Sequence, residues 1–299
     1  MNKQLSFEQA ARLIPDGAVV AVNSSSGLNC PDRMLAAIGE RFAAEGRPRG
    51  LTLMLPISAG DMYGIKGIDH VAKKGLLARV LAGSYPSGPS SMEPPAIWKM
   101  IAADEVAAYN VPSGVLYDML RDAAGRRAGV LTRIGLDTFV DPRRNGCKMN
   151  AAARDDIVRL VQFNGEEWLH FSNLYPGVAI VRGTTADDDG NVSMEEEGAQ
   201  LGPLDVALAA RNSGGTVIAQ VTASSQPSSS RISGTSGEIP NPRFTASPAA
   251  SSSAARRAIT LSGPNATRSN SSRGFLASPE SAGSWRVCVA CICSGSTTT

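Results

Sequence analysis

The first residues that could do chemistry lie in a small polar loop near the N-terminus. Residues 23–27 read Asn-Ser-Ser-Ser-Gly; they follow the apolar run 18–22 and precede Pro31, which opens an amphipathic pattern. Such a loop is a candidate anion cradle, because unpaired backbone N–H groups and the positive end of a helix dipole would face it. A plain connection between a strand and a helix explains the same pattern equally well.

Three further loops place small or polar residues after an apolar run. They follow the runs 71–82, 105–110 and 130–134. In an open α/β sheet, ligands gather at the carboxyl ends of the strands, so we expect the four loops to line one crevice. The residues predicted to bind substrate there are Ser24, Ser25, Ser26, Gly27, Gly83, Ser84, Asn110, Gly114, Thr138 and Arg143.

The stretch 129–150 carries the densest polar chemistry of the chain. It begins with a short apolar run, in which Val130, Leu131 and Ile134 are expected to fill a buried strand. Glycines and an Asp141-Pro142 turn follow, which permit positive φ and force an extended or turned backbone. By spacing alone, an ordinary strand and turn remains the simpler interpretation.

The elements that must position these loops are short apolar runs alternating with amphipathic helices. A helix opening at Pro31 carries Met34, Leu35, Ile38 and Phe42 on one face. The runs 51–57, 178–181 and 216–221 predict buried strands, and residues 157–171 have the spacing of a hairpin around Asn164-Gly165. The pattern predicts one α/β domain over residues 1–222, with an open, mainly parallel sheet flanked by helices. The acidic run 195–197 is expected to be a solvated helix start.

Composition indicates a metabolic enzyme more than a binder of nucleic acid. Hydrophobic residues make up 42% of the chain, but no apolar run reaches 18 residues, so no membrane span is expected. The first residues lack a basic segment followed by an apolar one, so no signal peptide is expected either. The predicted compartment is therefore the cytoplasm. Residues 1–222 hold 22 Lys and Arg against 25 Asp and Glu, a balance of −3. This mildly acidic body argues against a nucleic-acid surface.

The composition changes abruptly after Thr222. Of the last 77 residues 20 are serine, and the charges there are 7 Arg and 2 Glu. Such a segment cannot build a core, so residues 223–299 are predicted to be a low-complexity, disordered tail or the product of a shifted reading frame. A flexible partner-binding tail is the alternative, and Cys288, Cys291 and Cys293 lack the further ligand that a metal site needs.

Several motifs resemble family I coenzyme A transferases, the single-chain acetate and 3-oxoacid type. Residues 135–150 are similar to the signature Gly-x-Gly-Thr-Phe-Val-Asp-Pro-Arg-x-x-Gly-Gly-Lys-x-Asn, with Asp137 and Cys147 in place of glycines. Residues 16–31 resemble the N-terminal signature, in which residues 23–25 replace Gly-Gly-Phe and Asn29 replaces a later glycine. The turns 110–114 and 182–191 also match, and the resemblance extends over about residues 5–222.

The resemblance implies transfer of CoA between an acyl-CoA and a short-chain carboxylate or 3-oxoacid, the chemistry of short-chain fatty acid and ketone body metabolism. Coenzyme A would be a substrate, and no other cofactor is implied. The family's nucleophilic glutamate belongs to its second half, which nothing here matches, so no catalytic residue is assigned. The chain thus resembles an N-terminal, α-type half with a β-type half or a second copy as partner; an inactive, truncated fragment is the alternative.

Overall fold

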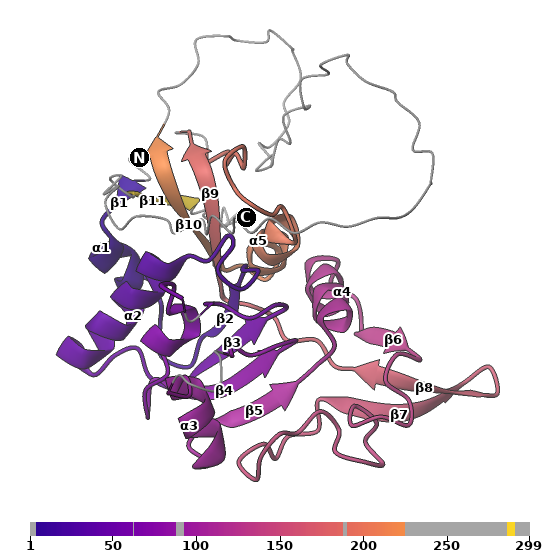
Figure 1. Ribbon diagram of the computed structural model, residues 1–299. Helices are drawn as coiled ribbons and strands as arrows, with labels where there is room; N and C mark the ends of the chain where they lie inside the picture. Colours follow the sequence, from indigo (N-terminus) through magenta and orange to yellow (C-terminus); the bar gives the residue numbers. More distant parts are fainter. Residues whose placement is uncertain (1–3, 62, 88–92, 188–189, 225–285, 291–299) are drawn as a thin grey trace, which may run out of the picture.

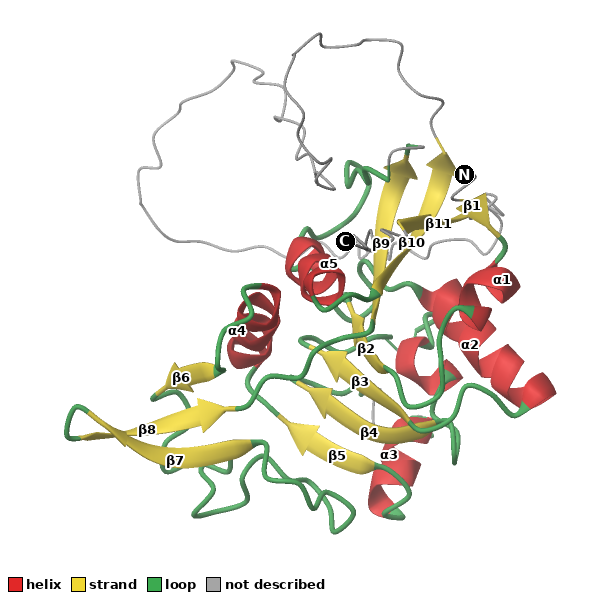
Figure 2. Cartoon of the chain, turned by 180° about the vertical axis from the view of Figure 1, so that it is seen from behind, coloured by secondary structure: helices red, strands yellow, loops and turns green. Residues whose placement is uncertain are grey.

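The computed structural model describes residues 4–61, 63–87, 93–187, 190–224 and 286–290. Within them, one large sheet forms the centre, in the order β1-β11-β10-β9-β2-β3-β4-β5 (Figure 1). A small antiparallel sheet, β6-β8-β7, lies beyond β5 (Figure 2). The strands of the large sheet are β1 (Gln4–Leu5), β2 (Val19–Val22), β3 (Leu51–Leu55), β4 (Leu77–Ala82), β5 (Ala107–Asn110), β9 (Val178–Ala186), β10 (Thr216–Ser224) and β11 (Arg286–Ala290). Those of the small sheet are β6 (Val130–Thr132), β7 (Val158–Phe163) and β8 (Glu166–Phe171).

The strands from β10 to β5 run parallel, and β11 is antiparallel to both of its neighbours. Every residue of β3 is buried, as are three of the four in β2. Continuous apolar burial is typical of parallel strands that are covered on both faces. The predicted open, mainly parallel α/β sheet is therefore confirmed.

Helices cover the two faces of the sheet (Figure 1). One face packs in an apolar cluster with α1, α2 and α3, and the other with α4 and α5 and with the small sheet. The helices are α1 (Phe7–Arg12), α2 (Asp32–Glu45), α3 (Ala96–Ala102), α4 (Ser113–Ala124) and α5 (Pro203–Asn212), with a 3₁₀ turn η1 (Gly67–His70). In α2, Met34, Leu35 and Ile38 are buried as their spacing predicts.

One expectation about a single segment needs correction, and a second is confirmed. Of the three apolar residues expected in a buried strand after Gly129, only Val130 is buried, whereas Leu131 is 37% and Ile134 56% exposed. The reason is that β6 is a three-residue edge strand, and Ile134 lies beyond its end. The hairpin around Asn164 is confirmed, with a left-handed φ of 52° at that residue.

The predicted domain boundary at residue 222 stays a prediction, because most residues beyond it lie outside the described part of the chain. Two observations bear on it. Strand β10 continues to Ser224, and the backbone of β11, inside the segment expected to be non-globular, pairs with β10 and β1. Those five residues therefore belong to the sheet.

Candidate functional site

Hydrogen bonds join the loops that follow β2, β3 and β4. The backbone N–H of Ser26 donates to Ser58 O at 2.8 Å, and Gly60 N–H donates to Ser26 O at 2.9 Å. The next link runs from Ser58 N–H to the hydroxyl of Ser84, at 3.1 Å. The carboxyl ends of three neighbouring parallel strands thus meet in one network of hydroxyl and backbone groups.

Glycines let these loops approach more closely than other residues would. A Cβ at Gly83 would collide with Pro56 O and with Ser113 in the first turn of α4, so the β4 loop packs directly against the start of that helix. A Cβ at Gly27 would collide with the carboxylate of Asp61. Gly114, in contrast, has open space around its Cβ position. The structure therefore places the predicted residues 24–27, 83–84 and 114 along one edge of the sheet.

The fourth predicted loop joins this edge only through Asn110. Asn110 N–H donates to Cys147 O at 2.9 Å, and Met149 N–H donates to Ala108 O at 3.0 Å, so the end of the 129–150 stretch runs along β5. Thr138 donates its hydroxyl to Gly135 O, within its own turn. Arg143 is also bound locally and does not extend toward the other loops.

The Arg143 guanidinium forms a clamp with Asp141. Its Nε and Nη2 donate to the carboxylate at 3.0 and 2.7 Å, and its Nη1 binds Glu167 at 2.9 Å. Asp141 is fully buried, and bonds from Arg143 hold its pKa far below the usual range, while Asp141 raises the pKa of Arg143. The Asp-Pro-Arg turn is therefore held in place by its own ion pairs, and the positive charge of Arg143 is neutralised by Asp141 and Glu167.

Residues that replace glycines of the resembled signatures keep a backbone that favours glycine. Asn29 has φ of 54°, Asp137 of 61° and Cys147 of 68°. Asparagine and aspartate tolerate this left-handed region better than most residues, whereas cysteine has no such advantage. All three residues therefore hold a backbone conformation that glycine adopts without strain.

A segment that sequence reasoning misjudged packs against the β2 loop. The acidic run 195–197 was expected to be a solvated helix start. Glu195 and Glu196 are exposed as expected, but they lie in a turn and no helix begins there. The Glu197 side chain is only 3% exposed and pairs with Arg182 at 3.1 Å. Asn29 exchanges two hydrogen bonds with Ala199, and Gly198 packs on Leu28. The only signal for this contact in the sequence was Arg182, at the start of the 182–191 motif.

Comparison with known proteins now decides the family. A sequence profile described as "Coenzyme A transferase" matches residues 5–231. The chain belongs to the coenzyme A transferase family. It is 38% identical over 221 residues to a caffeate CoA-transferase of Acetobacterium woodii, which covers 74% of this chain and 41% of that protein.

Solved structures agree with this assignment. The acyl-CoA transferase YdiF of Escherichia coli O157:H7, in a thioester complex with CoA, superposes with a TM-score of 0.69 at 32% identity, over 75% of this chain and 43% of YdiF. The alpha subunit of acetate CoA-transferase from E. coli K12 is 23% identical over 70% of this chain and 82% of that subunit. The chain thus spans less than half the length of the caffeate CoA-transferase and of YdiF, and most of the length of the alpha subunit.

Cys30 and Cys147 of this CoA-transferase chain are buried and unsuited to nucleophilic attack. Burial raises the pKa of both Cys30 and Cys147 to about 12, so their thiols are protonated at neutral pH. No cluster of three His, Cys, Asp or Glu side chains that could hold a metal occurs in the described ranges. Nor does any described helix have the length and apolarity to cross a bilayer.

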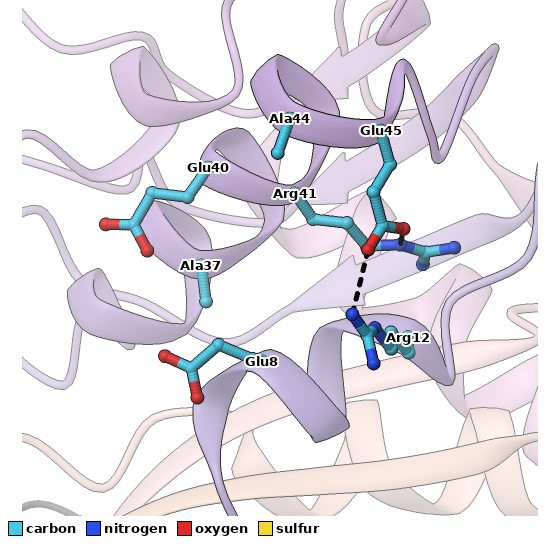
Figure 3. A pocket seen from close by; sticks show the side chains of 7 residues that line it. All are labelled: Glu8, Arg12, Ala37, Glu40, Arg41, Ala44 and Glu45. Atoms are coloured by element: carbon cyan, nitrogen blue, oxygen red, sulfur yellow. Dashed lines mark hydrogen bonds and ion pairs between the residues drawn. The ribbon is translucent and has the colours of Figure 1, made fainter.

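A hollow of about 210 Å³ lies between α1 and α2, away from the loops that resemble the family's motifs (Figure 3). Its charged side chains pair with one another or with a neighbour: Arg12 and Arg41 bind Glu45, while Glu8 and Glu40 bind Arg33. Arg41 also donates to two backbone carbonyls that end α1. The hollow is a groove between packed helices whose charges are already satisfied.

Proposed function

We propose that the chain is the N-terminal, α-type half of a CoA-transferase, which binds acyl-CoA and carboxylate substrates at the carboxyl edge of its sheet and needs a β-type half for chemistry. The network joining Ser26, Ser58 and Ser84 carries this proposal. It gathers hydroxyl groups at the strand ends of an open α/β sheet, where ligands bind. The described α4 has no side-chain cap at its N-terminus, so its first N–H groups face the same edge.

The reaction we propose moves CoA between an acyl-CoA and a short-chain carboxylate or 3-oxoacid. In the family that this chain resembles, a glutamate from the second half attacks the acyl-CoA thioester, which gives a mixed anhydride and releases CoA thiolate. The thiolate then attacks the glutamyl carbonyl and expels the acyl group as a carboxylate, and the resulting glutamyl-CoA thioester passes CoA to the acceptor carboxylate in the reverse sequence. Two buried carboxylates of the described chain are unsuited to that role, since Asp141 is clamped by Arg143 and Glu197 is paired with Arg182. Coenzyme A takes part in this reaction as a substrate. We propose that the reaction takes place in the cytoplasm.

The lengths of the relatives support a partner for this chain. Two proteins named alpha subunits, of acetate CoA-transferase and of an acetoacetyl-CoA:acetate/butyrate CoA transferase, match over 82% and 83% of their lengths. We propose that this chain likewise contributes binding loops to a site that a β-type half or a second copy completes. Without a positioned nucleophile, a pocket that binds substrate does not lower the barrier.

The test compares binding with turnover in the purified full chain. Acetyl-CoA should bind in a calorimetric titration, whereas incubation with acetoacetyl-CoA and acetate should give no CoA transfer. Borohydride treatment followed by mass spectrometry should show no reduced glutamate. A modified peptide from within residues 1–299 would mean that the chain carries its own nucleophile.

A matched pair of glycine variants tests the location of the site. Gly83→Ala should weaken acetyl-CoA binding, because its Cβ would push the start of α4 away from the β4 loop. Gly177→Ala is the control, since its Cβ meets nothing within 4 Å. Equal acetyl-CoA affinity in the two folded variants would remove the proposed edge from consideration.

A further inference from the structure

Asn23 is a buried amide without a protein partner. Its backbone N–H donates to Ile180 O at 2.9 Å, which continues the ladder between β2 and β9 by one residue. The residue is 1% exposed, and neither Oδ1 nor Nδ2 forms a hydrogen bond with any described protein atom. A buried amide normally finds partners, because leaving it unpaired forfeits its bonds with water.

Three other asparagines of the described chain form side-chain hydrogen bonds with the protein. Asn150 donates to two backbone carbonyls and accepts from Ala108 N–H. Asn29 exchanges bonds with Ala199, and Asn173 donates to Arg127 O. In the described regions, some other buried side chains have one polar atom without a hydrogen bond, whereas both polar atoms of the Asn23 amide lack one. The fold itself therefore does not account for this amide.

The position of Asn23 places it beside the proposed substrate edge. Ala21 packs in the cluster with α4 and α5, whereas Val20 and Val22 pack in the cluster with α2. Because side chains alternate along a strand, Asn23 lies on the same face as Ala21, the face on which α4 begins against Gly83. The next residue, Ser24, opens the loop that joins the β3 and β4 loops.

We propose that Asn23 is a specificity-determining residue whose amide binds a hydroxyl group on the acyl chain of the substrate, which makes hydroxy-substituted short-chain acids the preferred substrate class. A single hydroxyl satisfies both atoms of the amide, since its oxygen accepts from Nδ2 and its hydrogen donates to Oδ1. The glycine that resembled family members have at this position has no side chain to bind such a group. This inference rests on the proposed function, because it assumes that the carboxylate substrate binds at this edge.

The experiment compares two probes that differ by one hydroxyl. The ¹⁵N-labelled full chain is titrated with 3-hydroxybutyrate and with butyrate, and the side-chain NH₂ signal of Asn23 is followed by NMR. We expect the hydroxy acid to bind about tenfold more tightly and to shift that signal, since its two hydrogen bonds to the amide replace bonds that the hydroxyl makes with water in solution. Asn23→Gly should abolish the preference, and Asn173→Gly, an asparagine outside the site, should retain it.

Each other outcome points to a different failure. Equal affinity for the two acids, with the Asn23 signal unmoved, would overturn the inference and leave the proposed function standing. If neither acid nor acetyl-CoA binds, the proposed function fails and the inference falls with it. Thermal unfolding of Asn23→Ala supplies an independent check: an unchanged or higher Tm is expected, and a fall of several degrees would show that the amide has a structural partner instead.

Discussion

Replacing Asp141 with asparagine keeps the shape of a fully buried side chain while removing its charge. The carboxylate accepts from the backbone N–H groups of Asp137 and Arg143, at 3.0 and 2.9 Å, and from the Arg143 guanidinium through both oxygens. Asparagine accepts at one oxygen only and presents an NH₂ group to donors at the other position. The substitution therefore breaks the bonds made at one oxygen and weakens the remainder.

The magnitude follows from those bonds. A hydrogen bond to a charged group contributes about 1.5–3 kcal/mol, and two are lost outright. Arg143 is 43% exposed, so water and salt screen its share and we expect a net loss of about 3 kcal/mol. For a domain of this size, that corresponds to a fall in Tm of about 6–12 °C. Asp155→Asn is the matched control, because Asp155 is 71% exposed and its pair with Arg79 should contribute about 1 kcal/mol or less.

The pH dependence gives this prediction a second measurable signature. The pKa of Asp141 is lowered on folding, so its contribution to stability is fully present above the unfolded pKa of about 4 and is lost as the pH falls toward the lowered value. The difference in Tm between the unmodified chain and Asp141→Asn should therefore be largest near pH 7 and shrink below about pH 4. Differential scanning fluorimetry across this range measures both. If Asp141→Asn costs no more than Asp155→Asn at pH 7, the clamp is not a stabilising element.

Further predictions concern the buried cysteines, two residues with left-handed backbone, and the pair of Arg182 with Glu197. Burial raises the pKa of Cys30 and Cys147 to about 12, so iodoacetamide at pH 8 should leave both thiols unmodified in the native chain and label both in urea. Peptide mapping measures the labelling, and labelling of either thiol in the native chain would contradict its burial. Asp137→Gly should raise the free energy of unfolding by about 0.5 kcal/mol, since relief of the left-handed backbone exceeds the entropy cost of glycine. Cys147→Gly should lower it by about 1–2 kcal/mol, because this change also removes a fully buried side chain. Chemical denaturation measures both, and changes of the same sign in the two variants would refute the comparison. Arg182→Met should cost about 3 kcal/mol by leaving the Glu197 carboxylate buried and unpaired, and adding Glu197→Leu should recover part of the loss in a double-mutant cycle; strictly additive losses would show that the pair is not coupled.

The sheet could be predicted from sequence because its signal is local. In Leu51–Leu55 every residue but Thr52 is apolar, and such a nearly continuous apolar run is typical of a strand buried on both faces. Exposure in the small sheet was harder to predict, since Leu131 and Ile134 are as apolar as core residues and only their place at an edge leaves them in solvent. Local composition does not encode which strand becomes an edge.

Sequence predicted that loops after parallel strands meet at one edge, but it did not predict that Thr138 and Arg143 bind within their own turn. That the loops after β2, β3 and β4 meet follows from parallel strand order, which the alternation of strands and helices already implies. That Arg143 is held by Asp141 depends on the direction of one side chain, which residue spacing does not specify. Likewise, the burial of Glu197 depends on Arg182, which lies fifteen residues earlier in β9. Binding of substrate by the ten predicted residues stays a prediction.

The strand order also has a consequence for how the chain reaches this structure. Strand β2 pairs with β3, which follows closely, and with β9, which is made roughly 150 residues later. At ordinary rates of synthesis, that interval is on the order of ten seconds or more. During it, the nascent sheet ends at the apolar edge Val20–Val22, a surface open to strand pairing with other chains. The slowest and most aggregation-prone period of folding therefore closes when β9 emerges from the ribosome and pairs with β2, and substitutions that weaken β9 should lower soluble yield before they lower the stability of the finished fold.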